Sequence, residues 1–220
     1  MQSADNFATE RAHMVRDQLR ARGISNPRVL DAMATVPRQE FVPAQLRASA
    51  YADGPLPLGD GQSISQPLMV ATLLEALELQ GHENVLDVGT GSGYQAALLA
   101  CVASSVVSIE IVPELAVSAE QTLRRLGYPD VRVVVGDGSL GWPAWGPYDA
   151  IVVAAGAPRV PAALLAQLAD QGRLVIPVGD LAGQVLLRVR TDNGVVTTEQ
   201  LVGCKFVPLL GQDGWPANEQ

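Results

Sequence analysis

The sequence has few of the residues that form disulfide frameworks and metal centres. Its 220 residues include two cysteines and two histidines, and 5% are aromatic. Two cysteines are too few for a disulfide framework or a thiolate metal cluster. Cys101 and Cys204 lie in apolar runs, so we expect two buried free thiols. His13 and His82 lie far apart without a nearby carboxylate or cysteine pattern, which favours solvated side chains and predicts no metal site.

Positive charge and long apolar runs are scarce as well. Fifteen Lys and Arg residues stand against 23 Asp and Glu residues, for a net charge of −8. This balance disfavours binding to nucleic acid or to anionic membranes. No apolar run approaches the roughly 18 residues of a membrane span, and the N-terminus carries no apolar secretion signal. We expect a monomeric cytoplasmic protein with no nucleic-acid or membrane partner.

The length and the 48% hydrophobic content are those of one α/β domain. Within it we distinguish N-terminal helices and an active-site loop (1–66), a cofactor-binding core (67–180), C-terminal strands (181–211) and a tail (212–220) whose last residues we expect to be disordered. The apolar spacing predicts a helix from about Ala8 to Gly23 and a second over Asn26–Val36. The loop from Pro37 to Pro67 is broken by proline and glycine, and such long loops are usually functional.

From Pro67 onward, helical and strand patterns alternate, which is typical of a doubly wound, mostly parallel sheet covered on both faces. After a helix beginning at Pro67, the expected elements are strand Val85–Val88, helix Ser92–Val102, strand Val106–Glu110, helix Pro113–Leu126, strands Val131–Val135 and Tyr148–Val153, helix Val160–Ala169 and strand Arg173–Pro177. Three further strand-like runs, Gln184–Val189, Val195–Leu201 and Lys205–Leu209, have no helices between them. The Asn193-Gly194 turn predicts an antiparallel hairpin at the sheet edge.

A glycine-rich loop follows the first strand of this core. The run from Val85 to Tyr94 places Gly89, Gly91 and Gly93 between a strand and a helix, where backbone approaches a ligand closely. The dinucleotide fingerprint needs a glycine where Tyr94 stands, which disfavours a nicotinamide-dependent oxidoreductase. Asp87, two residues before the first glycine, suits a cofactor with a cationic amino group. The pattern therefore favours S-adenosylmethionine, although a tight turn without a ligand is the alternative.

Two further acidic residues end the neighbouring strands. Glu110 follows Asp87 by 23 residues, where a carboxylate can accept hydrogen bonds from both ribose hydroxyls of a nucleoside cofactor. In Gly136-Asp137-Gly138, the aspartate is placed to accept from the adenine amino group, with a plain surface turn as the alternative. The long loop ends in Gln62-Ser63-Ile64-Ser65-Gln66-Pro67, so Ser65 lies at a helix N-terminus. It is either an anion-binding residue or only a helix cap.

Several motifs occur together in order: Val36-Pro37-Arg38, Phe41-Val42-Pro43, Leu56 to Pro67, Gly89 to Tyr94, Gly136-Asp137-Gly138 and Phe206-Val207-Pro208-Leu209. With these the chain resembles the protein-L-isoaspartate O-methyltransferase family from about Arg11 to Gly211. The resemblance implies that Ser65 is the active-site serine. It also implies S-adenosylmethionine contacts, with S-adenosylhomocysteine as the product, from Ser63, Ile64, Asp87, Gly89, Thr90, Gly91, Ser92, Glu110, Ile111, Asp137 and Gly138.

The same resemblance implies a Rossmann-like class I methyltransferase fold with seven strands, the last of them exchanged in order. The implied reaction methylates the free α-carboxylate of L-isoaspartyl residues and starts their repair through a succinimide. Methylation of an aspartate in one dedicated partner peptide, and cofactor binding without catalysis, are the alternatives. Three residues depart from the family pattern: Leu68, Ala154 and Gly156, of which the last two follow a strand at the expected substrate mouth.

Overall fold

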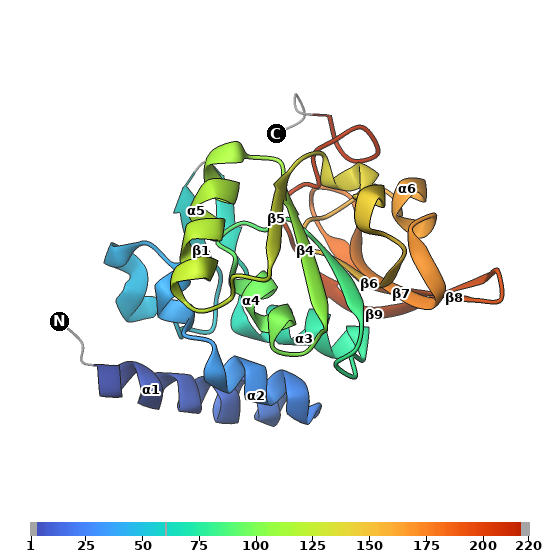
Figure 1. Ribbon diagram of the computed structural model, residues 1–220. Helices are drawn as coiled ribbons and strands as arrows, with labels where there is room; N and C mark the ends of the chain where they lie inside the picture. The colour runs from blue at the N-terminus through green and yellow to red at the C-terminus, as the bar shows by residue number, and fades with distance from the viewer. Residues whose placement is uncertain (1–3, 60, 217–220) are drawn as a thin grey trace.

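A twisted seven-stranded sheet forms the centre of the computed structural model, which describes residues 4–59 and 61–216 (Figure 1). Its strand order is β5-β4-β3-β6-β7-β8-β9. The strands are β3 (Asn84–Val88), β4 (Ser105–Glu110), β5 (Arg132–Val135), β6 (Tyr148–Val153), β7 (Leu168–Gly179), β8 (Gln184–Asp192) and β9 (Val195–Cys204). β3 to β7 pair in parallel, and β8 and β9 pair antiparallel at one edge. The predicted doubly wound sheet with an antiparallel edge is confirmed.

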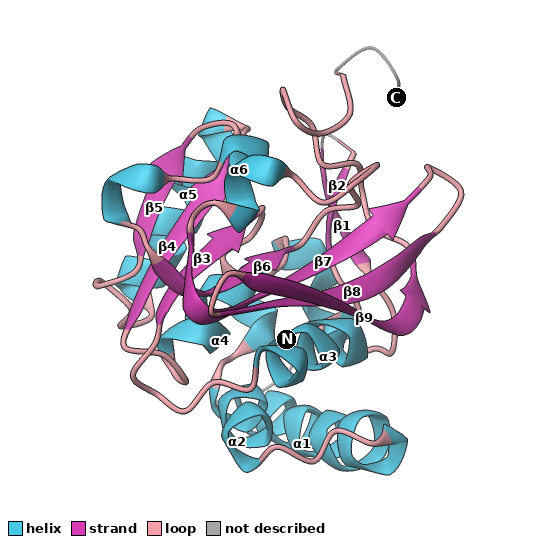
Figure 2. Ribbon diagram, turned by 90° about the vertical axis from the view of Figure 1, so that its right-hand side faces the viewer, coloured by secondary structure: helices cyan, strands magenta, loops and turns pink. Residues whose placement is uncertain are grey.

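Helices cover both faces of the parallel part (Figure 2). They are α1 (Ala4–His13), α2 (Pro27–Thr35), α3 (Pro67–Leu77), α4 (Tyr94–Ala100), α5 (Pro113–Arg125) and α6 (Ala162–Leu165). Residues of α2, α3 and α4 share one core cluster with Val85, while Leu86 packs with Leu164 of α6 in the other. Since neighbouring strand residues point to opposite faces and both faces are covered, apolar residues are needed on both, which explains why Val85, Leu86 and Val88 of β3 are all apolar.

The N-terminal region is irregular but follows the predicted helices. α1 continues through a π-helical stretch (Met14–Leu19) and a 3₁₀ turn (Arg20–Arg22), and the helical segment ends at Gly23 with φ 100°. The side chain of Asn26 caps α2 by accepting from the Arg28 backbone N–H at 3.0 Å. The long loop holds two 3₁₀ turns and a hairpin, namely Arg38–Phe41, Ala44–Ser49, β1 (Leu56–Gly59) and β2 (Gln62–Ile64). Two further 3₁₀ turns, Gly138–Leu140 and Pro143–Trp145, follow β5.

Three local predictions were wrong. The expected helix Val160–Ala169 is only the single turn of α6, because the chain from Leu168 already pairs with Tyr148 as part of β7. The expected strand Lys205–Leu209 forms only an isolated bridge between Pro208 and Gly156. The predicted buried thiols differ too, since Cys101 is exposed and Cys204 is partly exposed.

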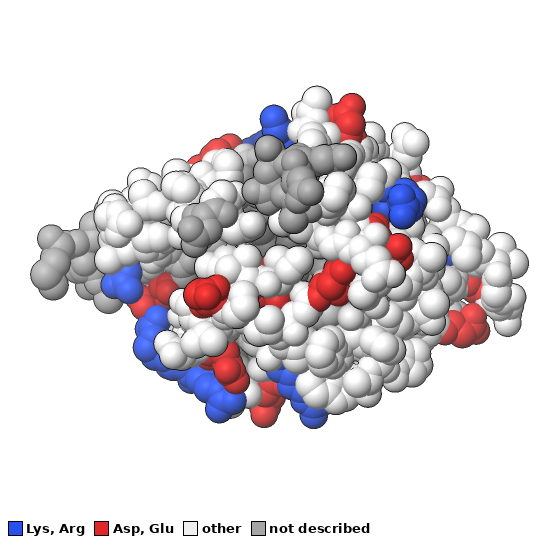
Figure 3. All heavy atoms as spheres, turned by 90° about the horizontal axis from the view of Figure 1, so that it is seen from above, with Lys and Arg blue, Asp and Glu red and all other residues white. Residues whose placement is uncertain are grey.

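Other expectations concern sites and surfaces. Both histidines are exposed as predicted. In the described part of the chain, no group of His, Cys, Asp and Glu side chains is arranged to hold a metal ion, and no helix is long and apolar enough to cross a membrane. The expectation of a disordered end falls largely on residues 217–220, outside the described residues. Seen from above, basic side chains lie among acidic ones rather than in a uniform basic patch (Figure 3).

Candidate active site

The glycine loop connects β3 to α4 at the carboxyl edge of the sheet. Gly89, Gly91 and Gly93 all have positive φ, at 95°, 52° and 87°. A Cβ on Gly93 would lie 3.3 Å from both Ala119 and Leu123 of α5, so glycine there also permits close packing of α4 against α5. The loop therefore brings its backbone to the cavity and turns directly into a helix.

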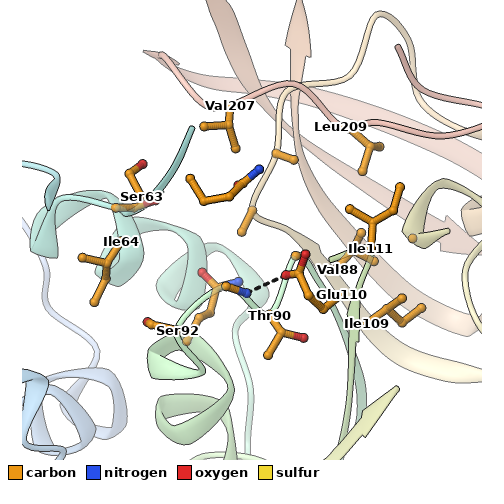
Figure 4. Close-up of a pocket in the computed structure, with 18 of the residues that line it drawn as sticks. Ser63, Ile64, Val88, Thr90, Ser92, Ile109, Glu110, Ile111, Val207 and Leu209 are labelled. Atoms are coloured by element: carbon orange, nitrogen blue, oxygen red, sulfur yellow. Dashed lines mark hydrogen bonds between the residues drawn. The ribbon is translucent and has the colours of Figure 1, made fainter. Parts of the chain in front are cut away.

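Glu110, the last residue of β4, is fixed to this loop. Its Oε2 accepts from the Gly91 backbone N–H at 2.7 Å, and its Oε1 accepts from the Val112 N–H at 3.0 Å. The side chain is 5% exposed and borders a cavity above the glycine loop (Figure 4). A carboxylate held in this way is preorganised to accept hydrogen bonds from a ligand's hydroxyl groups.

Asp87 lies beneath the same loop. It is fully buried, its carboxylate accepts from Gln95 Nε2 at 2.8 Å and from Ser108 Oγ at 2.7 Å, and it does not border the cavity. The Ser108 hydroxyl also lies 2.6 Å from Thr90 Oγ1, and Thr90 does border the cavity. Burial raises the pKa of Asp87 to about 6, against the lowering effect of its two hydrogen bonds. Asp87 is thus connected to the cavity indirectly, through Gln95, which also borders the cavity, and through Ser108 and Thr90.

The Gly136-Asp137-Gly138 turn follows β5 and closes one wall of the cavity. Gly138 borders the cavity, and a Cβ there would lie 2.5 Å from Val88 Cγ1, so this position requires glycine. Asp137 accepts from the Ser139 N–H at 2.9 Å and from the Gln212 N–H at 2.7 Å, and it does not border the cavity. The turn is therefore part of the site, whereas the Asp137 carboxylate is occupied in holding the C-terminal segment.

Ser65 lies between β2 and α3 and borders two adjoining cavities. The N-cap of α3 is Gln66, without a side-chain capping bond, so the helix-cap alternative for Ser65 does not hold. Its hydroxyl makes no hydrogen bond to the described residues. Pro67 occupies the first turn, and the N-terminal end of α3 favours a nearby anion. Ser65 is thus placed to contact an anionic ligand.

The buried side chain of Arg38 fixes the loop that carries Ser65. Its side chain is 0% exposed, with Nε donating to the Ala50 carbonyl at 2.7 Å and Nη2 donating to the Ser65 carbonyl at 2.8 Å. The guanidinium lies over the Tyr94 ring at 4.9 Å from its centroid, while Nη1 is buried without a partner among the described residues. Burial lowers the pKa of Arg38 and raises that of Tyr94. One side chain thereby ties the loop to α4.

Most of the predicted cofactor residues border the first cavity. Figure 4 shows Ser63 and Ile64 on one side, Glu110 and Ile111 on the other, and Val207 and Leu209 across the top. The predicted residues that border the cavity are Ser63, Ile64, Ser65, Gly89, Thr90, Gly91, Ser92, Glu110, Ile111 and Gly138. Asp87 and Asp137 do not border it. Their cofactor contacts stay predictions.

A second, larger cavity of about 800 Å³ begins at Ser65 and runs under the C-terminal segment. It shares with the first cavity the residues Gln62, Ser63, Ser65, Ala154, Val207, Pro208 and Leu210. Two ligands placed in the two cavities would therefore meet beside Ser65. The arrangement suits transfer of a group from one bound molecule to another.

Sequence reasoning missed several residues of this site. Arg38 and the Val207–Leu210 segment stood in motifs that carried the family resemblance, but no local pattern indicated their positions. Of the departing residues, Ala154 borders both cavities and Leu68 borders neither. The Gly156 carbonyl accepts from the Leu209 N–H at 2.8 Å, and the Gly156 N–H donates to the Val207 carbonyl at 2.8 Å. Gly156 therefore holds the part of the cavity wall formed by Val207 and Leu209. A Cβ on Gly156 would lie 2.8 Å from Gln184 Cδ, so a larger residue there would displace that side chain.

Comparison with known proteins places this geometry in a family. Residues 9–214 match the family described as protein-L-isoaspartate(D-aspartate) O-methyltransferase. The chain is 51% identical over 214 residues to a protein-L-isoaspartate O-methyltransferase of Trichlorobacter lovleyi, covering 97% of this chain and 99% of that protein. It is 55% identical over 208 residues to protein-L-isoaspartate O-methyltransferase 2 of Marinobacter nauticus, covering 94% and 95%.

Solved structures agree with the sequence relatives. A structure titled protein-L-isoaspartate O-methyltransferase superposes with a TM-score of 0.83 at 29% identity, covering 93% of this chain and 67% of that one. A crystal structure of a putative protein-L-isoaspartate O-methyltransferase from Plasmodium falciparum, in complex with S-adenosyl-L-homocysteine, gives a TM-score of 0.77 at 25% identity, covering 90% of this chain and 96% of that one. The resemblance drawn from the motifs is confirmed, and the chain belongs to the protein-L-isoaspartate(D-aspartate) O-methyltransferase family.

Proposed function

We propose that the chain transfers a methyl group from S-adenosylmethionine to the free α-carboxylate of L-isoaspartyl residues in damaged peptides and proteins. The observation that carries this proposal is the meeting of two cavities at Ser65, one bordered by the glycine loop and Glu110, the other open to a peptide. Family membership supplies the reaction, and the geometry of the two cavities supports a role for each group of residues around them.

The residues that border the first cavity suit the cofactor. When bound, S-adenosylmethionine supplies an electrophilic methyl group on its sulfonium. Glu110, fixed by the Gly91 and Val112 N–H groups, is placed to accept from the two ribose hydroxyls. Gly138, whose lack of a Cβ lets its backbone lie close against Val88, contributes backbone without a side chain to the cavity, which suits a planar base. Backbone N–H groups near Ser92 and Tyr94 at the start of α4 suit the carboxylate end of the cofactor.

Ser65 orients the substrate carboxylate. A carboxylate with an ordinary pKa near 4 is ionised at neutral pH, so it attacks without a general base. The Ser65 hydroxyl donates to one carboxylate oxygen and directs the other toward the methyl group. Arg38 fixes the Ser65 backbone for this task through the Ser65 carbonyl. Rate enhancement then comes from position rather than from proton transfer. The amide nitrogen of the following residue afterwards attacks the methyl ester and displaces methanol, which gives a succinimide, and hydrolysis of the succinimide returns some normal aspartate.

The test uses two synthetic peptides of identical sequence, one with an isoaspartyl and one with a normal aspartyl residue. With labelled S-adenosylmethionine, the isoaspartyl peptide is expected to take up label that base releases as methanol, and the aspartyl twin is expected to take up none. Equal labelling of both peptides would favour a methyltransferase for ordinary aspartate. No labelling of either would contradict the proposed function.

We further propose that the protein acts as a cytoplasmic monomer without a nucleic-acid or membrane partner. The net charge of −8 and the mixed charges of Figure 3 support the part that concerns nucleic acid and anionic membranes, since both disfavour binding to polyanions. Sedimentation of the purified chain at micromolar concentration is expected to give a species of 23.2 kDa. A species of twice that mass would contradict the monomer.

A further inference from the structure

The second cavity has an unbalanced charge. Its described lining residues include no Asp or Glu and a single cation, Lys205. The rest of the lining is apolar or neutral, with Met69, Leu181, Phe206 and Pro208 among its members. The chain as a whole carries a net charge of −8 and therefore repels anions. The second cavity is a local exception to this repulsion.

Lys205 is the only lysine of the chain. Its side chain is exposed and makes no ion pair or hydrogen bond with the described residues. Arg188 on the neighbouring strand differs, since it pairs with Glu78 at 2.7 Å and with Glu199 at 2.5 Å. The charge of Lys205 is therefore available to a ligand in the cavity.

Hydrogen bonds hold the backbone directly after Lys205 in place. The Phe206 N–H donates to Gln184 Oε1 at 2.8 Å, and the Val207 carbonyl accepts from the Gly156 N–H at 2.8 Å. Gln184 is itself buried and donates to the Asp180 carbonyl at 2.6 Å. A flexible lysine on a fixed backbone can reach a range of carboxylate positions without moving the cavity wall.

Lys205 borders the second cavity but not the first, whereas Ser65 borders both. The carboxylate to be methylated must lie at the junction, beside Ser65. A cation paired with that carboxylate would make it a weaker nucleophile. A cation that lies further along the path of the bound peptide is therefore better suited to bind a different anionic group of the peptide. The nearest anionic group a peptide can offer there is the side chain of an adjacent residue.

We propose that Lys205 forms a subsite for an acidic side chain directly flanking the isoaspartyl residue. This inference rests on the proposed function and adds a substrate class to it, namely isoaspartyl peptides with a neighbouring Glu or Asp. The residue tunes specificity and takes no part in the chemical step.

The experiment measures kcat/KM for labelled methyl transfer to isoaspartyl hexapeptides that differ at one position. Glu, Gln or Lys is placed directly before the isoaspartate in one set and directly after it in another. For the unmodified enzyme at low salt, the Glu peptide of at least one set is expected to exceed its Gln counterpart by about three- to fivefold, as for one partly exposed ion pair. Lys205→Gln removes the preference, and Lys205→Glu reverses it toward the Lys peptide, with the change mainly in KM.

The matched control is Arg20→Glu, which makes the same change in net charge at an exposed residue outside both cavities that has no ion pair with the described residues. This variant is expected to keep the preference for Glu. Equal kcat/KM for the Glu and Gln peptides in the unmodified enzyme would overturn the inference and leave the proposed function intact. The same change of peptide preference in Lys205→Glu and Arg20→Glu would do so as well. Absence of methylation of every peptide would instead contradict the proposed function itself, and this inference with it.

Discussion

The two halves of the site are built differently. The cofactor half comes from the ends of adjacent parallel strands β3, β4 and β5, whose carboxyl ends meet at one edge of the sheet. The substrate half combines the Ser65 loop with the Gly203–Leu210 segment, which are about 140 residues apart in the sequence. The half that we propose for the cofactor is fixed mainly by β3 and β4, which are almost entirely buried, whereas the Ser65 loop depends on a few specific contacts, above all those of Arg38.

The largest expected effect tests this dependence on Arg38. Arg38→Met would leave the Ala50 and Ser65 carbonyls without their buried donors, at about 1–3 kcal/mol each. We expect a loss of roughly 4 kcal/mol in unfolding free energy in urea. Turnover of the folded fraction should also fall while S-adenosylmethionine binding remains. Arg20→Met, at an exposed site, is the control, and equal losses in the two variants would remove the special role of Arg38.

The next effect concerns the buried carboxyl group under the cofactor loop. The pKa of Asp87 is raised from an ordinary value of 3.8 to about 6, so protonation stabilises the folded protein relative to the unfolded chain. That contribution is complete below about pH 4 and is lost as the pH rises through about 6. Asp87→Asn should therefore gain stability relative to the unmodified protein over this range, by up to about 3 kcal/mol.

Urea unfolding at a series of pH values measures this gain. Asp31→Asn makes the same chemical change at a residue exposed on α2 and is the control. An equal gain in both variants would show that the effect does not come from burial of Asp87. A constant difference between Asp87→Asn and the unmodified protein from about pH 4 to about pH 7 would show that Asp87 titrates normally.

A smaller effect is expected at Glu110, which holds the cofactor half together. Glu110→Gln keeps one acceptor oxygen but cannot serve both backbone N–H groups and the ribose hydroxyls. We expect S-adenosylmethionine affinity to fall about 30-fold, or about 2 kcal/mol, by calorimetry. Glu120→Gln, on the exposed face of α5, should bind normally. Unchanged affinity in Glu110→Gln would mean that the cofactor half is held elsewhere.

The difference between the two halves of the site also explains which features could be predicted from the sequence. The glycine loop, Glu110 and the parallel strands are marked by local patterns of apolar runs and turn residues, and nine of the eleven predicted cofactor residues border the first cavity. The extension of β7 back to Leu168 could not be predicted, because pairing of Leu168 with Tyr148 of β6 overrides the helical preference of an Ala- and Leu-rich segment. The positions of Arg38 and Lys205 depend on contacts between distant segments, which no local spacing encodes.

The most direct test of this account compares cofactor binding with turnover in Ser65→Ala. Removing the hydroxyl should leave the affinity for S-adenosylmethionine within about twofold, because Glu110 and the glycine loop are untouched, while turnover of an isoaspartyl peptide falls about 100-fold. Ser118→Ala, on the exposed face of α5, controls for the loss of a hydroxyl elsewhere. Full turnover in Ser65→Ala, or a loss of cofactor affinity as large as the loss of turnover, would contradict the assignment of Ser65 to the substrate carboxylate.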